Sequence, residues 1–186
     1  MQGNKILDTK VLDPYAQALL ALAQSSNLVE AFGDDARLIS ETVNSSEELQ
    51  TFLESPFSGD EAKKNVLKQL FGGKIQPFME NFLMLLVDRR RIMFLAGICQ
   101  QYQVLMRKLK GIVLAEVRSV VELTDAQKDQ IKQRVQAVTN ANEVEIESEI
   151  DPSLIGGVVI KAGSQVIDAS LKGQLRQISL RLAGLG

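Results

Sequence analysis

The chain has 186 residues, 45% of them hydrophobic and 5% aromatic, and its 21 basic and 23 acidic side chains give a formal net charge of −2. This length fits one or two globular domains, and the balanced charge gives no reason to expect a nucleic-acid-binding protein. Histidine is absent and Cys99 is the only cysteine, which excludes His-dependent catalysis, an internal disulfide and a Cys-cluster metal site.

Residues 13 to about 110 carry apolar side chains at helical spacing throughout. The first helix is expected to run from Asp13, as N-cap, through Pro14 at the first helical position to near Ser26. Five more helices are expected, over residues 28–43, 49–53, 58–71, 77–91 and 92–110.

Local signals mark the ends of several of these helices. The run Ser58-Gly59-Asp60-Glu61 matches a capping box that opens the helix over 58–71, and Gly72-Gly73 ends it. Pro77 suits the first position of the next helix. Helices of this kind with short connections predict a compact α-bundle domain over residues 1–110.

At Gly111 the spacing of apolar residues changes from a period of 3.6 to a period of 2. A half-buried strand is expected from residue 113 to residue 121. A capping box at Thr124 opens the helix that follows. The apolar face of that helix is expected to consist of Ile131, Val135 and Val138.

A second strand is expected over residues 144–150, with glutamates on one face. The turn at Asp151-Pro152-Ser153 leads into a third strand that contains Gly156-Gly157, and Asp168 opens the final helix. The order β-α-β-β-α predicts a small domain over residues 111–186, so the whole chain is expected to belong to the α+β class.

Several local patterns resemble functional sites, and each has a plainer structural explanation. Gly72-Gly73-Lys74 lacks the earlier Gly and the following Ser or Thr of a phosphate loop, so we favour a helix stop. Arg89-Arg90-Arg91 also suits a phosphate or an anionic lipid surface, but cations are favoured at a helix C-terminus, and we prefer that explanation. Glu145, Glu147 and Glu149 alternate with apolar residues, as on a solvated sheet face rather than in a cation site.

Cys99 lies in an apolar helical segment, which favours a buried, inert thiol. We therefore predict no catalytic, cofactor-binding or metal-binding residue. The first five residues show neither a signal-peptide core nor transit-peptide character, and no apolar run approaches the roughly 18 residues of a membrane span. We expect a soluble protein of a reducing compartment.

The helices expected over 13–26 and 77–91 are more apolar than one packed face requires. Each carries two adjacent apolar stripes. They are Tyr15, Leu19 and Leu22 beside Ala16, Leu20 and Ala23, and Phe78, Phe82 and Leu85 beside Met79, Leu83 and Leu86. Such helices are either central in the bundle or expose a groove for a partner helix, and periodicity favours the central position. The pair Gly156-Gly157 likewise allows either close backbone contact within the sheet or a surface that supports another subunit.

Three short motifs occur in order along the chain. Tyr15-Ala16-Gln17-Ala18-Leu19 comes first, and Leu86-Val87-Asp88-Arg89-Arg90-Arg91 follows. A glycine-rich signature near the C-terminus consists of Ile155, Gly156, Gly157, Gly163, Asp168 and Leu175. Their order, together with a bundle followed by an α+β domain, resembles the delta subunit of F-type ATP synthases, called OSCP in mitochondria, over nearly the whole chain. The chain looks closest to cyanobacterial and plastid members.

The resemblance implies a non-catalytic connector in the peripheral stalk, present as a single copy in a hetero-oligomer. Residues 1–110 would bind N-terminal segments of the alpha subunits in the catalytic head, and residues 111–186 would hold the ends of b-type stalk subunits. Such a connector keeps rotor torque from spinning the head, so that rotation drives ATP synthesis. It needs no cofactor. It would lie on the cytoplasmic or stromal face of a thylakoid or bacterial inner membrane, in contact with the membrane only through the complex.

The resemblance also reverses the preference for central helices, because the two apolar helices form the partner groove of that family. The groove residues it implies are Tyr15, Ala18, Leu19, Leu22, Phe78, Met79 and Phe82. Leu19 and Phe82 are expected to span the edge of the core and the groove. The alternative is a free-standing helix-binding adaptor or regulatory module, and an enzyme is a more distant one. Co-purification with alpha and b subunits would separate the connector from the adaptor.

Overall fold

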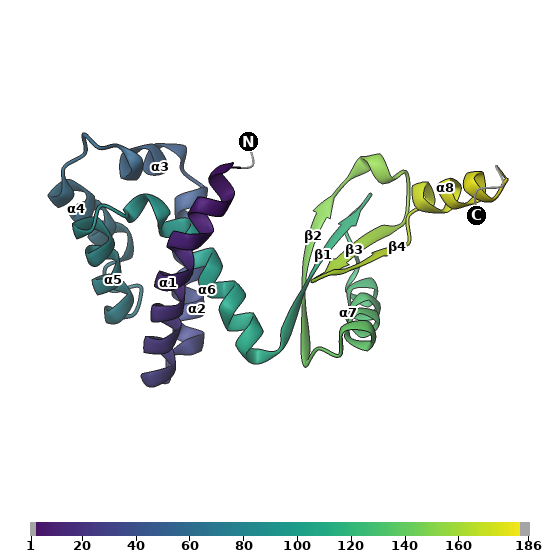
Figure 1. Ribbon diagram of the computed structural model, residues 1–186, viewed down its shortest axis with the longest axis horizontal. Helices are drawn as coiled ribbons and strands as arrows, with labels where there is room; N and C mark the ends of the chain where they lie inside the picture. The colour runs from purple at the N-terminus through teal and green to yellow at the C-terminus, as the bar shows by residue number, and fades with distance from the viewer. Residues whose placement is uncertain (1–2, 183–186) are drawn as a thin grey trace. The chain divides into compact units, whose positions relative to one another are not determined.

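The computed structural model describes residues 3–182 of the chain, and the side chains of residues 11–179. Within this range the chain forms eight α-helices, two short 3₁₀ helices and four strands, which confirms the α+β class. They belong to two compact units, Met1–Met106 and Arg107–Gly186 (Figure 1). The division lies inside the last helix of the bundle, slightly before the boundary predicted at residue 110. None of the helices in the described range is both long enough and apolar enough to cross a membrane.

The first unit is a helical bundle around one core. Its elements are α1 (Gly3–Ser25), α2 (Val29–Asn44), α3 (Glu47–Glu54), α4 (Asp60–Phe71), α5 (Pro77–Asp88), η1 (Ile92–Phe94) and most of α6 (Leu95–Lys110). The largest fully buried side chains include Tyr102, Phe32 and Phe71. Each helix buries one apolar face in this core, and burial of that face is the main source of stability for helices of this length.

Helix α1 begins earlier than the sequence analysis predicts, at Gly3 instead of Asp13, and Pro14 lies inside it. The carboxylate of Asp13 is not an N-cap, because its Oδ1 accepts a hydrogen bond of 2.6 Å from Gln101 Nε2 in α6. Leu12 packs against Gly97 of the same helix, so closely that a Cβ on Gly97 would lie 3.0 Å from Leu12 Cδ1. Pro14 removes one backbone hydrogen bond from α1, and these contacts with α6 support the helix at that point.

Two other helix ends differ from the predictions. The N-cap of α4 is Gly59, and no side chain caps it, so the capping box predicted at Ser58 is wrong. Helix α5 starts at Pro77 as predicted but ends at Asp88, before the three arginines. It stops there because Arg90 adopts a positive φ of 53°, which the helix cannot continue.

The second unit is a mixed sheet with helices. Its elements are β1 (Ile112–Ser119), α7 (Asp125–Thr139), β2 (Glu143–Ile150), η2 (Pro152–Leu154), β3 (Val158–Ala162), β4 (Gln165–Asp168) and α8 (Leu171–Leu182). The strand order is β2-β1-β3-β4. β1 pairs with β2 in parallel through the crossover helix α7, and the β1–β3 and β3–β4 pairs are antiparallel.

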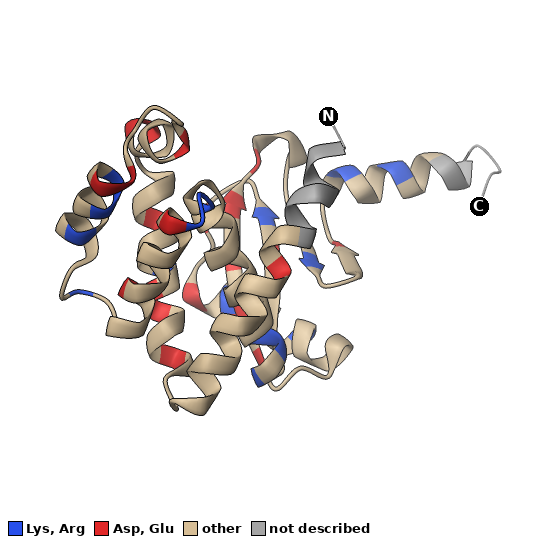
Figure 2. Cartoon of the chain, turned by 60° about the vertical axis from the view of Figure 1, so that its left-hand side comes forward, with Lys and Arg blue, Asp and Glu red and all other residues tan. Residues whose placement is uncertain are grey.

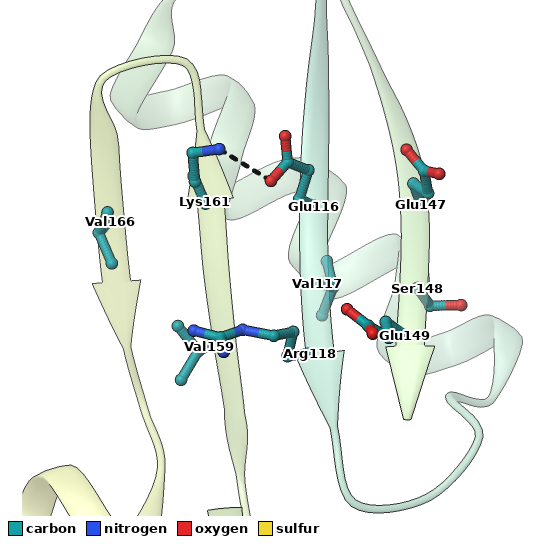
Figure 3. Close-up of a pocket in the computed structure, with 9 residues that line it drawn as sticks. All are labelled: Glu116, Val117, Arg118, Glu147, Ser148, Glu149, Val159, Lys161 and Val166. Carbon is teal, nitrogen blue, oxygen red and sulfur yellow. Dashed lines mark hydrogen bonds and ion pairs between the residues drawn. The ribbon is translucent and has the colours of Figure 1, made fainter. Parts of the chain in front are cut away.

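Helix α7 covers one face of this sheet. Its Ile131 and Val135 pack on inward-facing residues of three strands: Ala115, Val117, Val144, Ile160 and Ala162. Val138, predicted for the same helix face, is 48% exposed, because it lies in the last turn of α7 beyond the buried pair. The opposite sheet face carries charged side chains, among them Glu116, which accepts a hydrogen bond of 2.9 Å from Lys161 Nζ across β1 and β3 (Figure 3).

Strand β4 was not predicted, so the sheet has one strand more than the order β-α-β-β-α contains. It spans only Gln165–Asp168, too few residues for a clear alternating pattern. Gly156 and Gly157 precede β3 and are not part of it. Asp168 ends β4, and α8 starts at Leu171, so Asp168 is not the residue that opens the last helix.

Candidate functional site

Helices α1 and α5 each contribute to the core and also keep apolar side chains at the surface. The buried stripes are Ala16, Leu19 and Ala23 of α1, and Met79, Leu83 and Leu86 of α5. The neighbouring stripes are partly or largely exposed, and we call them the α1/α5 surface: Tyr15, Ala18, Leu22, Phe78, Phe82 and Leu85. Phe78 is 46% exposed and Leu85 is 44% exposed. Large apolar side chains grouped in this way mark surfaces that other proteins cover.

Two residues predicted for the partner groove belong to the core instead. Leu19 is 2% exposed and Met79 is 0% exposed. Each lies on the inner stripe of its helix, one residue along from an outward-facing neighbour, because successive helical residues point in different directions. The prediction of Leu19 and Met79 as groove residues is therefore corrected. Tyr15, Ala18, Leu22, Phe78 and Phe82 keep exposed area, and their role in binding stays a prediction.

Aromatic rings join the two helices at this surface. The ring centroids of Tyr15 and Phe82 lie 6.3 Å apart with an angle of 59° between the planes. Arg91, just beyond the end of α5, donates a hydrogen bond of 2.8 Å from Nη1 to the Tyr15 hydroxyl. Its guanidinium carbon also lies 5.5 Å from the centroid of the Tyr15 ring, within cation–π range. Arg91 therefore orients one aromatic side chain of the α1/α5 surface.

The three arginines thus have more specific roles than a favourable position near a helix dipole. Arg89 is the C-cap of α5, and Arg90 takes the left-handed conformation that turns the chain. Arg91 closes the turn, since its backbone N–H donates to Leu86 O at 2.8 Å. The sequence showed that the run ends a helix, but not that its last member reaches α1.

The glycine-rich signature of the second unit holds the beginning of α8 against the beginning of β3. Gly157 has φ +80°, and a Cβ there would collide with the carbonyl oxygen of Ala169. A Cβ on Gly156 would lie 2.7 Å from Leu171 Cδ1. The backbone N–H of Leu171 donates to Gly156 O at 2.9 Å. Of the two explanations left open for this glycine pair, the structure shows the close backbone contact.

Asp168 and Ser170 belong to the same junction. We call Gly156, Gly157, Asp168 and Ser170, which together position the start of α8, the α8 mount. Asp168 Oδ1 accepts hydrogen bonds from the backbone N–H of Ser170 at 2.9 Å and from its hydroxyl at 2.6 Å. These two hydrogen bonds lower the pKa of Asp168 below its usual range. The hydroxyl oxygen of Ser170 in turn accepts from Gly173 N at 3.0 Å, as an N-cap residue does. Ser170, which the sequence analysis missed, therefore caps α8.

The remaining signature residues lie at the surface. Gly163 has φ +60° in the turn between β3 and β4, where a Cβ would meet no atom within 4 Å. Ile155 is 69% exposed and Leu175 is 57% exposed. Of the signature residues, Gly156, Gly157 and Asp168 thus belong to the α8 mount, whereas Ile155 and Leu175 are exposed apolar side chains. The signature contains no group suited to catalysis.

The described residues do not offer a catalytic or metal site. Burial raises the pKa of the Cys99 thiol to about 12, so the nucleophilic thiolate is scarce at neutral pH. No cluster of three or more potential metal ligands occurs among the residues that the structure describes. Glu145 forms an ion pair of 2.7 Å with Arg107 Nε, and Glu147 and Glu149 are exposed on the open sheet face.

Comparison with known proteins places this architecture in a family. The sequence model of the ATP synthase delta (OSCP) subunit matches residues 11–182. The chain is 55% identical over 174 residues to ATP synthase subunit delta of Synechococcus sp. (strain PCC 6716), covering 94% of this chain and 95% of the relative. It is 50% identical over 182 residues to ATP synthase subunit delta of Synechocystis sp. (strain ATCC 27184 / PCC 6803 / Kazusa), covering 98% of both.

A solved structure shares the fold. A chain of the Toxoplasma gondii mitochondrial ATP synthase hexamer superposes with a TM-score of 0.74 over 92% of this chain and 97% of that chain. The two sequences are 23% identical, so this likeness concerns the fold alone.

Proposed function

The chain belongs to the ATP synthase delta (OSCP) subunit family, and we propose that its two units hold two different parts of the synthase. Membership makes it a non-catalytic peripheral-stalk subunit that associates with other ATP synthase subunits. The observation that carries the proposal is that each unit leaves apolar side chains exposed on its helices. In the first unit they include Phe78 and Leu85 of α5, beside the partly exposed Tyr15 and Leu22 of α1. In the second they include Leu171, Leu175 and Ile178 of α8.

The first unit binds N-terminal segments of alpha subunits through the α1/α5 surface. Phe78, Phe82 and Leu85 follow each other at helical spacing along α5, with Tyr15 beside Phe82. An amphipathic helix laid along these side chains would bury them, which is the usual mode of helix recognition. Full burial of an exposed large apolar side chain contributes about 1.5–3 kcal/mol, and each of these partly buried side chains would contribute about half of that or less.

The second unit binds the ends of b-type stalk subunits. Together the two contacts connect the catalytic head to the stalk, so that the head resists rotor torque. As part of a membrane-associated complex, the subunit lies on the cytoplasmic or stromal face of a thylakoid or bacterial inner membrane. It contacts the membrane only through its partners.

Co-purification tests this function. Tagged full-length chain is expressed together with alpha and b-type subunits and recovered through its tag, and the complex is weighed by native mass spectrometry. We expect one copy of the chain with both kinds of subunit. Recovery of a monomer without either partner would instead support a free-standing helix-binding adaptor.

A further inference from the structure

Helix α8 carries an apolar face that its own unit does not bury. Leu171, Leu175 and Ile178 occur at positions i, i+4 and i+7, which places them on one side of the helix. They are 47%, 57% and 53% exposed, and none belongs to the core cluster around α7. A single exposed leucine is ordinary, but three on one helix face indicate a surface that another molecule covers.

The α8 mount fixes the start of this face. Leu171 is held through its backbone N–H on Gly156 O and through the contact of its side chain with Gly156. Ser170 caps the helix and is 2% exposed. The helix therefore leaves the sheet from a defined position with its apolar side uncovered, and a partner meets a pre-organised element.

The charge of α8 is opposite to that of the rest of its unit. Residues 171–182 contain three basic side chains and no acidic one, and in Figure 2 the described part of α8 carries blue segments and no red one. The rest of the second unit, residues 107–170, contains eight basic and ten acidic side chains, a net charge of −2. Lys172 and Arg176, one turn apart, border the apolar face and are exposed.

We infer that α8 is the docking element for an amphipathic helix whose apolar stripe is bordered by aspartate or glutamate. This inference rests on the proposed function, in which the second unit binds a stalk subunit, and adds the element and the chemistry of the partner. The partner's apolar stripe covers Leu171, Leu175 and Ile178. Its carboxylates pair with Lys172 and Arg176.

An anionic membrane surface fits these observations less well. A membrane would approach α8 together with the rest of the unit, in which ten acidic side chains outnumber eight basic ones, so that this remainder does not add to the attraction. The helix has only 12 residues and no aromatic side chain, whereas interfacial helices usually carry several anchoring apolar residues including aromatics.

The test uses the full chain and a peptide from the end of a b-type subunit, with affinity measured by calorimetry. Leu175→Glu and Ile178→Glu alter exposed residues, so circular dichroism should show an unchanged fold. We expect each to weaken binding at least tenfold. The pair Lys172→Glu and Arg176→Glu should weaken it by a similar factor and reverse its dependence on salt, because the new carboxylates repel those of the partner and salt screens that repulsion. Lys132→Glu, on the exposed side of α7 in the same unit, is the matched charge control and should leave the affinity within twofold.

The outcomes separate the inference from the proposed function. If the parent chain fails to bind the peptide, the proposed function fails and this inference with it. If the parent binds and Leu175→Glu binds equally well, the second unit holds the stalk through another surface and the assignment to α8 is wrong. Equal losses from Lys132→Glu and the α8 charge reversals would overturn the specific charge pairing. Binding of the parent to phosphatidylglycerol vesicles, lost in Leu175→Glu, would assign α8 to a membrane surface instead.

Discussion

Tyr15 of α1 and Phe82 of α5 pack together, with ring centroids 6.3 Å apart. One residue further along α5, Leu83 is fully buried, and within one turn of Tyr15 on α1, Leu19 is almost fully buried. The same two helices therefore supply the core and the α1/α5 surface from adjacent stripes. Substitutions on the two stripes should have different consequences.

Phe82→Glu should leave the bundle folded and weaken binding of an alpha N-terminal peptide tenfold or more. The substitution removes an apolar contact and places a charge in the contact region, and each 1.4 kcal/mol is a factor of ten. Calorimetry on the full chain measures the affinity, with circular dichroism as the control for folding. Leu19→Glu is the comparison on the buried stripe and should unfold the bundle, since it buries an unpaired carboxylate. A folded Phe82→Glu chain with unchanged affinity would remove the α1/α5 surface from the binding site.

Tyr15→Phe should lower the free energy of unfolding by about 0.5–1 kcal/mol. The phenol accepts the hydrogen bond from Arg91 at a partly exposed site, and a hydrogen bond there contributes only a modest net amount. Urea denaturation of Tyr15→Phe, Arg91→Ala and the double variant gives the coupling energy between the two side chains. Additive effects of the two substitutions would show that the contact does not contribute to stability.

Gly157→Ala should destabilise the second unit more than Gly163→Ala does. Both glycines have positive φ, so each alanine costs about 1–2 kcal/mol from the left-handed conformation alone. Only the Cβ at residue 157 meets a backbone atom, the carbonyl oxygen of Ala169, so this variant must also displace the α8 mount. Thermal unfolding of the full chain, with hydrogen exchange of α8 amides, measures both effects. Equal destabilisation by the two alanines would contradict the mount.

Asp35→Asn should stabilise the bundle at neutral pH. Burial raises the pKa of Asp35, although a hydrogen bond of 2.8 Å from Gln76 N–H partly opposes this. Because the pKa of Asp35 is higher in the folded state, protonation of this carboxyl favours folding. Its contribution to the free energy of unfolding is fully present below the unfolded pKa of about 3.9 and is lost as the pH rises through the folded pKa. The amide oxygen of Asn keeps the Gln76 hydrogen bond without the charge. The melting temperature of Asp35→Asn should exceed that of the parent at pH 7 and match it near pH 3.

The exposed neighbour Asp34 provides the control for this pH dependence. Asp34→Asn removes the same charge from the same helix without removing a buried carboxylate. It should change the melting temperature at pH 7 by less than Asp35→Asn does. A gain from Asp34→Asn of equal size would attribute the effect to net charge rather than to burial.

Local signals in the sequence correctly predicted helix ends that are fixed by contacts between neighbouring residues. The capping box at Thr124 is confirmed, since its hydroxyl accepts from Gln127 N and its own N–H donates to the Gln127 side chain. Pro77 lies in the first turn of α5 as predicted. The error at the start of α1 involves a distant contact. Helix α1 extends past Pro14, and Asp13 next to it accepts a hydrogen bond from Gln101, 88 residues away, a partner that no local pattern reveals.

The candidate functional site was likewise predictable only in part. Helical spacing placed apolar stripes on α1 and α5, but only packing decides which stripe faces the core, and Leu19 and Met79 were therefore misplaced. The contact of Arg91 with Tyr15 spans 76 residues and has no sequence signal. The glycine signature was visible as a pattern in the sequence. The structure adds the physical reason for Gly157, since a Cβ there would collide with the carbonyl oxygen of Ala169.

A connector of this kind holds two partners at once, through separate surfaces on separate units. A bridging measurement tests it most directly. An alpha N-terminal peptide is immobilised, the full chain is bound to it, and a peptide from the end of a b-type subunit is then added while surface plasmon resonance records the bound mass. We expect the second peptide to bind on top of the first, with Phe82→Glu losing only the alpha contact and Leu175→Glu only the b-type contact. Competition between the two peptides, or loss of both contacts from either single variant, would contradict the connector.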